Sequence, residues 1–84
     1  MNRVFLTGRV KGPTHVLHTP EGHKITKFVL RTDEEDIELE VYYKGREQVL
    51  SDGRKPHLMV FGSLARALER GLVIRAQEII CMED

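Results

Sequence analysis

The feature that most constrains the fold is an apolar stretch, residues 56–64, that contains a glycine and is followed closely by a second apolar stretch. Within it Leu58, Val60 and Leu64 alternate onto one face, with Gly62 in the same phase. An isolated glycine in a strand usually marks a bulge, a tight bend or a close approach of two backbones. A strand that bends while one face stays buried is typical of a small closed barrel.

The second apolar stretch, residues 71–80, is expected to be the neighbouring and last strand of that barrel. Its alternation directs Ile74 and Ala76 inward. Ile79 and Cys81 continue the inward face only if a bulge shifts the register, because they lie in the opposite phase.

Three further strands are expected upstream, over residues 2–10, 23–32 and 36–43. Apolar residues alternate with polar ones in each, which is the pattern of a strand with one buried face. The inward set is Val4, Leu6, Val10, Phe28, Leu30, Ile37, Leu39, Val41 and Tyr43. Residues 46–53 are expected to form a short helix or lid between the third and fourth strands. Five strands with this connector predict an all-β fold, an OB-fold barrel; an SH3-like small barrel is the alternative.

The second and third strands are predicted to form a hairpin around Glu34 and Glu35. A two-residue turn there places Arg31 opposite Glu38, a pairing of opposite charges that stabilises an antiparallel pair. The same register places Lys27 opposite Tyr42. Two glutamates suit a tight hairpin turn poorly, so a longer loop is the alternative.

The chain has 84 residues, which suggests a single domain spanning residues 1–84. Its 13 acidic and 13 basic side chains cancel, but residues 33–40 hold six acids and no base. The rest of the chain therefore has a balance of +6, which is compatible with an anionic ligand bound away from the acidic block. One cysteine, no membrane-length apolar run and no secretory signal suggest the cytoplasm.

Five segments, taken in order, resemble bacterial single-stranded-DNA-binding protein (SSB) and the related primosomal protein PriB. They are residues 2–10, 19–22, 27–32, 57–64 and 74–79. The resemblance implies an OB-fold that binds single-stranded DNA without catalysis, as a homo-oligomer, in replication, repair or replication restart. No tryptophan is present, the 33–36 turn is short and acidic, and the acidic tail by which SSB recruits partner proteins is missing, since the sequence ends at Met82-Glu83-Asp84. The short, tail-less form is closer to PriB than to SSB.

Binding of single strands requires cations along the backbone path and aromatic faces for the bases. Tyr42 is the candidate for stacking. The full set of candidate contacts is Lys11, Lys24, Lys27, Tyr42, Lys44, Arg46, Arg54, Lys55, Arg66 and Arg70. Phe5, Met59 and Phe61 are expected to form one outward apolar patch, and a homodimer interface is favoured over base stacking for Met59 and Phe61.

Two function classes remain open at this point. The first is an SSB/PriB-like protein that binds single-stranded DNA, with RNA also possible. The second is an OB-fold protein–protein adapter whose acidic turn is the docking element and whose nucleic-acid face is degenerate. No enzyme, cofactor or metal is predicted, because no nucleophile–base pair is visible and His15, His18 and His23 lack the cysteine partners or helix typical of a zinc site.

Overall fold

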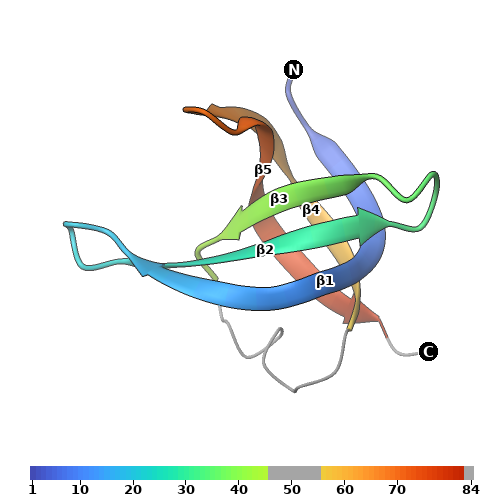
Figure 1. The fold of residues 1–84 in the computed structure, drawn as a ribbon, viewed down its shortest axis with the longest axis horizontal. Helices are drawn as coiled ribbons and strands as arrows, with labels where there is room; N and C mark the ends of the chain where they lie inside the picture. The colour runs from blue at the N-terminus through green and yellow to red at the C-terminus, as the bar shows by residue number, and fades with distance from the viewer. Residues whose placement is uncertain (46–55, 83–84) are drawn as a thin grey trace.

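The computed structural model describes residues 1–45 and 56–82, and in this part of the chain the backbone forms five β-strands (Figure 1). Their bounds are β1 Val4–His18, β2 Lys24–Thr32, β3 Glu38–Tyr43, β4 His57–Ala67 and β5 Gly71–Met82. The helix or lid predicted over residues 46–53 lies outside the described residues.

The strands form a closed barrel in the order β1-β2-β3-β5-β4, and β4 returns to pair with β1. All pairs are antiparallel except β3 with β5, which is parallel and spans only three residue pairs. This arrangement confirms the predicted all-β, OB-fold class.

The interior is filled by aliphatic side chains, one phenylalanine and one tyrosine. The buried cluster is Val10, Phe28, Leu30, Val41, Tyr43, Leu58, Val60, Ile74, Ala76 and Ile79, with Val4, Leu6 and Leu39 packed against it. Full burial of one such large apolar side chain contributes about 1.5–3 kcal/mol. The alternation in the sequence therefore identified most of the core.

The predicted glycine and bulge lie together, where β4 meets β5. A Cβ at Gly62 would lie 2.2 Å from the Arg75 carbonyl oxygen, so only glycine allows this approach of the two backbones. The register shifts between Phe61 and Gly62, which leaves Gln77 as the extra residue on β5. The bulge predicted in the last strand is thus confirmed, and it turns Ile79 into the core.

Three residues expected in the core are exposed instead. Leu64 and Ile37 are 40% and 47% exposed, and Cys81 is also exposed. Pairing of β4 with β1 ends at Gly62, so Leu64 lies on the part of β4 that extends beyond the barrel. Ile37 precedes β3 at the exit of the turn, and Cys81 lies near the end of β5. Alternation gives the phase of a side chain but not the point at which the barrel ends.

The first hairpin is longer than predicted, because β1 continues past Val10 to His18 and pairs with β2 as far as Lys24. The register shifts between Lys11 and His15, and Gly12 lies inside that interval with a φ of 75°. The Lys-Gly-Pro segment therefore forms a bulge within the ribbon instead of ending the strand. Figure 1 shows this hairpin projecting from the barrel, opposite the β2–β3 turn.

Candidate nucleic-acid interface

A hollow of about 860 Å³ lies where the end of β3 meets the β4–β5 hairpin, and we call it the Tyr42 groove. Its polar lining includes Tyr42, Lys44, Arg66 and Arg75. Its apolar lining includes Ile25, Val73 and three alanines: Ala65, Ala67 and Ala76. No carboxylate of residues 1–45 or 56–82 lines it. The groove therefore offers an aromatic ring, an apolar floor and three cations.

Strand pairing fixes how the aromatic ring lies between cations. Tyr42 on β3 is opposite Lys27 on β2 and opposite Arg75 on β5, and His15 on β1 is opposite Lys27. The row thus crosses four strands and places the partly exposed ring of Tyr42 between Lys27 and Arg75. The predicted pairing of Lys27 with Tyr42 is confirmed.

The predictions did not include Arg75 among the candidate contacts, yet it lines the groove beside Tyr42. The signal was available in the sequence: Ile74 and Ala76 face inward, so the residue between them must face outward. The parallel β3–β5 pairing, which brings Arg75 to Tyr42, is not visible in the alternation.

The candidate cations divide into those with and those without a carboxylate partner. Within the described residues, Lys44, Arg66 and Arg75 form no ion pair with a carboxylate. Arg70 Nη1 lies 2.7 Å from a Glu40 oxygen, and Lys27 Nζ lies 3.9 Å from the same atom. The groove therefore holds three cations that form no ion pair with a described carboxylate, and Lys24, which also forms none, lies at the start of β2.

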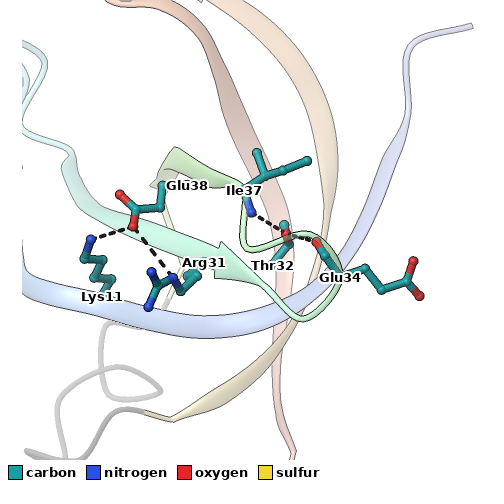
Figure 2. A network of polar contacts seen from close by, with 6 residues as sticks. All are labelled: Lys11, Arg31, Thr32, Glu34, Ile37 and Glu38. Atoms are coloured by element: carbon teal, nitrogen blue, oxygen red, sulfur yellow. Dashed lines mark hydrogen bonds and ion pairs between the residues drawn. The ribbon is translucent and has the colours of Figure 1, made fainter.

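Two other candidates, Lys11 and Lys24, do not line the groove. Lys11 forms a hydrogen bond with the Glu38 carboxylate (Figure 2), and Lys24 begins β2 at the projecting hairpin. Three candidates, Arg46, Arg54 and Lys55, lie outside the described residues. The structure thus brings Tyr42, Lys44 and Arg66 together and leaves Lys11 neutralised by its partner.

At the other end of β2 and β3 the chain turns through residues 33–36, which we call the acidic turn. The register predicted from a two-residue turn is confirmed, with Arg31 opposite Glu38 and their charges 3.7 Å apart, but the loop is the longer alternative. Glu35 and Asp36 have φ angles of 65° and 52°, in the left-handed region that glutamate seldom adopts.

Hydrogen bonds hold the acidic turn in place (Figure 2). The Thr32 hydroxyl accepts a bond from the Ile37 amide at 2.9 Å and donates one to the Glu34 carbonyl at 2.6 Å. The Asp33 amide donates to the Thr7 carbonyl at 3.0 Å. A hydrogen bond with His57, 2.7 Å long, together with one from Thr7, lowers the pKa of the Asp33 carboxyl below its ordinary value.

The predicted apolar patch is present on the outward face of β1 and β4. The rings of Phe5 and Phe61 have centroids 4.6 Å apart and are tilted by 51°. Met59 lies two residues along β4, and its partner on β5 is the exposed Ile80. Ile80 was absent from the predicted patch, because its outward phase arises from the bulge at Gln77.

Two features are absent from the described part of the chain. Residues 1–45 and 56–82 contain no cluster of three or more histidine, cysteine, aspartate or glutamate side chains placed to hold a metal ion. They also contain no helix of the length and apolarity that crossing a membrane requires.

No protein-family profile and no curated protein match this chain, but solved structures do. The single-stranded-DNA-binding protein of Thermus aquaticus matches with a TM-score of 0.84 and 24% identity, over 100% of this chain and 41% of that one. The N-terminal domain of PriB from Thermoanaerobacter tencongensis, described as dimeric, matches with a TM-score of 0.79 and 20% identity, over 99% and 98% of the two chains.

PriB from Ralstonia solanacearum matches with a TM-score of 0.77 and 21% identity, over 99% of each chain. The chain thus spans about two fifths of the Thermus protein and nearly all of the two PriB chains. The resemblance to SSB and PriB predicted from the sequence is confirmed at the level of the fold.

Proposed function

Because this chain has the barrel of the SSB and PriB structures, we propose that it binds single-stranded DNA without catalysis, in replication, repair or replication restart. The observation that carries the proposal is the Tyr42 groove: a partly exposed ring beside Lys44, Arg66 and Arg75, none of which forms an ion pair with a carboxylate among the described residues. We place this activity in the cytoplasm, with replication or restart proteins as partners.

The groove supplies the two interactions that single strands need. One base stacks on Tyr42, a contact that contributes about 1–3 kcal/mol and tolerates any sequence. The three cations meet neighbouring phosphates, and each neutralised phosphate lowers the slope of log K against log salt by about 0.7. Three phosphate contacts therefore predict a slope of roughly −2 from the groove alone.

The apolar floor favours an unstacked base over a duplex. Ile25, Val73 and Ala65 offer no hydrogen-bonding side chain that could read a base edge, so the contact is sequence-tolerant. These apolar side chains do not select for or against a ribose 2′-hydroxyl, so RNA is a second ligand to be measured beside DNA.

Fluorescence anisotropy of labelled oligo-dT and oligo-rU, between 50 and 200 mM NaCl, tests the proposal. Tyr42→Ala is expected to weaken binding at least fivefold, whereas Tyr42→Phe keeps the ring and stays within twofold of the wild type. Absence of binding by the wild type at low salt would overturn the assignment. Equal losses in Tyr42→Ala and Tyr42→Phe would overturn the stacking role.

We further propose that the chain acts as a homodimer, or as a tetramer of such dimers, through the outward patch of Phe5, Met59, Phe61 and Ile80. The dimeric PriB structure supports this assembly. Light scattering at micromolar concentration is expected to give a dimer for the wild type and a lower mass for Phe61→Glu. Leu72→Glu, which changes an exposed leucine outside the patch, is the matched control and is expected to stay dimeric.

A further inference from the structure

A second group of outward residues adjoins the Tyr42 groove, on the β1–β2 hairpin that projects from the barrel (Figure 1). On β1, His15 is opposite Lys27 and Leu17 is opposite Ile25. Ile25 lines the Tyr42 groove, and Lys27 is opposite Tyr42 on β3. The hairpin therefore continues the surface of the groove. We call the four residues His15, Leu17, Ile25 and Lys27 the hairpin platform.

Strand alternation shows that the hairpin platform faces outward. Thr26 is buried on β2, so its neighbours Ile25 and Lys27 lie on the outward face of that strand. Residues directly opposite each other in an antiparallel pair share a face, which places His15 and Leu17 on the same side. His15 is exposed and Leu17 is 41% exposed. The platform is therefore open to a ligand that also occupies the groove.

The bulge in β1 determines which side chain lies opposite Lys27. Between the pair of Lys11 with Val29 and the pair of His15 with Lys27, β1 has two more residues than β2. Without these two residues, Pro13 would be opposite Lys27. The bulge therefore brings an imidazole, which has a flat ring and can carry charge, into the row that leads to the groove.

Hydrogen bonds close the end of the hairpin beyond the platform. The Thr19 amide donates to the His23 carbonyl, and the Gly22 amide donates to the Thr19 carbonyl, each at 2.9 Å. The Thr19 hydroxyl accepts a third bond from the His23 amide at 3.1 Å. The platform thus belongs to a paired and closed ribbon. A ligand would not have to order it, which lowers the entropic cost of binding.

The charged groups that share a face with His15 are mostly cations. Strand alternation and pairing place the following titratable and charged groups on this face or beside it: Lys11, His23, Lys27, Arg31, Glu38, Glu40, Tyr42, Lys44, Arg70 and Arg75. Each of the two carboxylates among them contacts two cations. The excess of positive charge on this face suits an anionic ligand, and a protonated imidazole adds to it.

We propose that the hairpin platform holds a neighbouring nucleotide of the strand that stacks on Tyr42, and that affinity rises as His15 is protonated. The base lies against the imidazole ring and Leu17, because histidine is among the side chains on which single-stranded bases stack. The phosphate lies between His15 and Lys27. Strands two apart in a sheet are about 10 Å apart, so one strand can contact both Tyr42 and His15.

The predicted pH dependence follows from the ordinary chemistry of histidine, which changes its charge between pH 8 and pH 5. An imidazolium attracts a phosphate that a neutral imidazole does not. The proposal rests on the proposed function, since it extends the same strand from the groove onto the hairpin. His15 is thus an additional binding residue, and the groove alone does not account for it.

Fluorescence anisotropy of labelled oligo-dT with the full chain, at pH 6.0 and pH 8.0 in 50 mM NaCl, tests the platform. The wild type is expected to bind about three- to fivefold more tightly at pH 6.0 than at pH 8.0. His15→Ala is expected to lower this ratio at least twofold and to weaken binding at pH 6.0 at least threefold. His15→Phe keeps a ring without the charge. It is expected to bind within twofold of the wild type at pH 8.0 and to show the same lowered ratio.

His18→Ala is the matched control. His18 lies on the same strand and is also opposite a lysine, Lys24, but it shares the face of the buried Thr26 and so points away from the platform. This variant is expected to keep the affinity and the pH ratio of the wild type. His23 and His57 are present in both variants, so their titration does not affect the comparison.

Equal losses in His15→Ala and His18→Ala would show a general attraction to positive charge and would overturn the proposal. So would a pH ratio in His15→Phe equal to that of the wild type. In either case, weaker binding by Tyr42→Ala would leave the assignment of the groove standing. Absence of oligo-dT binding by the wild type at both pH values would overturn the groove and the platform together.

Discussion

The two ends of the β2–β3 ribbon carry opposite charge, although the same two strands build both. At one end Tyr42 and Lys44 join Arg66 and Arg75 in a groove whose described lining contains no carboxylate. At the other end lies the acidic turn, residues 33–36, in which Asp33 contacts His57 and the other three acids form no ion pair among the described residues. Between them the charges are paired.

The paired middle of the ribbon separates the two surfaces. Glu38 contacts Lys11 and Arg31, and Glu40 contacts Lys27 and Arg70. Exposed pairs of this kind add little stability, with a median near 0–1 kcal/mol. Their consequence here is electrostatic, because they cancel charge along the strands and leave the unpaired groups at the ends. A formal net charge of zero therefore hides two oppositely charged surfaces.

The distance between the ends makes them independent at physiological salt. An extended chain from Asp36 to Tyr42 spans about 20 Å at the rise of a strand. The Debye length is about 8 Å near 0.15 M salt and about 30 Å at 0.01 M. The acidic turn thus repels a strand in the groove only when the salt concentration is low.

The largest effect is expected from placing an acid in the cationic end. Arg75→Glu puts a carboxylate beside Tyr42 and removes one phosphate contact. Binding of oligo-dT at 50 mM NaCl is expected to fall more than tenfold, and the salt slope is expected to shrink by about one to two. Arg3→Glu makes the same change in charge outside the groove and is expected to weaken oligo-dT binding less than threefold. Similar losses in both variants would mean that net charge, not the groove, controls binding.

A smaller effect distinguishes unpaired from paired cations. Lys44→Ala removes a groove cation that has no carboxylate partner among the described residues, and binding of oligo-dT is expected to weaken about three- to fivefold. Lys11→Ala removes a cation that is hydrogen-bonded to the Glu38 carboxylate, and binding of oligo-dT is expected to change less than twofold. Isothermal titration of both variants measures the contrast. An equal loss in Lys11→Ala would show that this ion pair opens to meet phosphate.

A still smaller effect is expected from neutralising the acidic end with Glu34→Gln, Glu35→Gln and Asp36→Asn. Removing three negative charges reduces the repulsion of a bound strand, so tighter DNA binding is expected. With the groove about 20 Å away along the strand, the gain is expected to be below twofold at 0.15 M salt and to appear only near 0.01 M. Anisotropy at both salt concentrations measures it. A large gain at 0.15 M would show that the DNA path crosses the turn.

The smallest effect concerns pH and the turn itself. The hydrogen bonds from His57 and Thr7 lower the pKa of the Asp33 carboxyl in the folded state below its ordinary value of 3.8. The ionised carboxylate therefore stabilises the fold at a pH above 3.8. This stabilisation is lost as the pH falls through the pKa of the folded state. Asp33→Asn is expected to destabilise the protein at pH 5 and to differ less from the wild type at pH 3.

Urea denaturation at pH 5 and pH 3 measures how much Asp33→Asn changes the free energy of unfolding. Glu21→Gln, which removes an exposed carboxylate with no ion-pair partner among the described residues, is the control. A wild type and an Asp33→Asn variant that differed by the same amount at pH 5 and pH 3 would contradict the role of the hydrogen bonds.

Alternation in the sequence predicted the phase of the barrel correctly because one buried face imposes a period of two on each strand. It identified Phe28, Leu30, Val41 and Val60 as core, and the glycine and bulge near residue 62. Alternation wrongly predicted that Leu64 and Ile37 are buried. The point at which a strand leaves the barrel depends on where its pairing with the neighbouring strand ends, and alternation does not show this.

The candidate site was predicted only in part for a similar reason. Tyr42, Lys44 and Arg66 were named from their outward phase and loop positions, and they lie together. Arg75 was missed because its neighbour is set by the parallel β3–β5 pairing, which brings together residues far apart in sequence. The same limit applies to Lys11, whose partner Glu38 belongs to a strand that is not its direct neighbour in the barrel.

The most direct test of the separation between the two ends is a titration of ¹⁵N-labelled protein with oligo-dT at 0.15 M NaCl, followed by amide chemical shifts. The largest changes are expected at Tyr42, Lys44, Arg66 and Arg75, with residues 33–36 unchanged. Changes centred on the acidic turn, or spread evenly over both ends, would contradict the account.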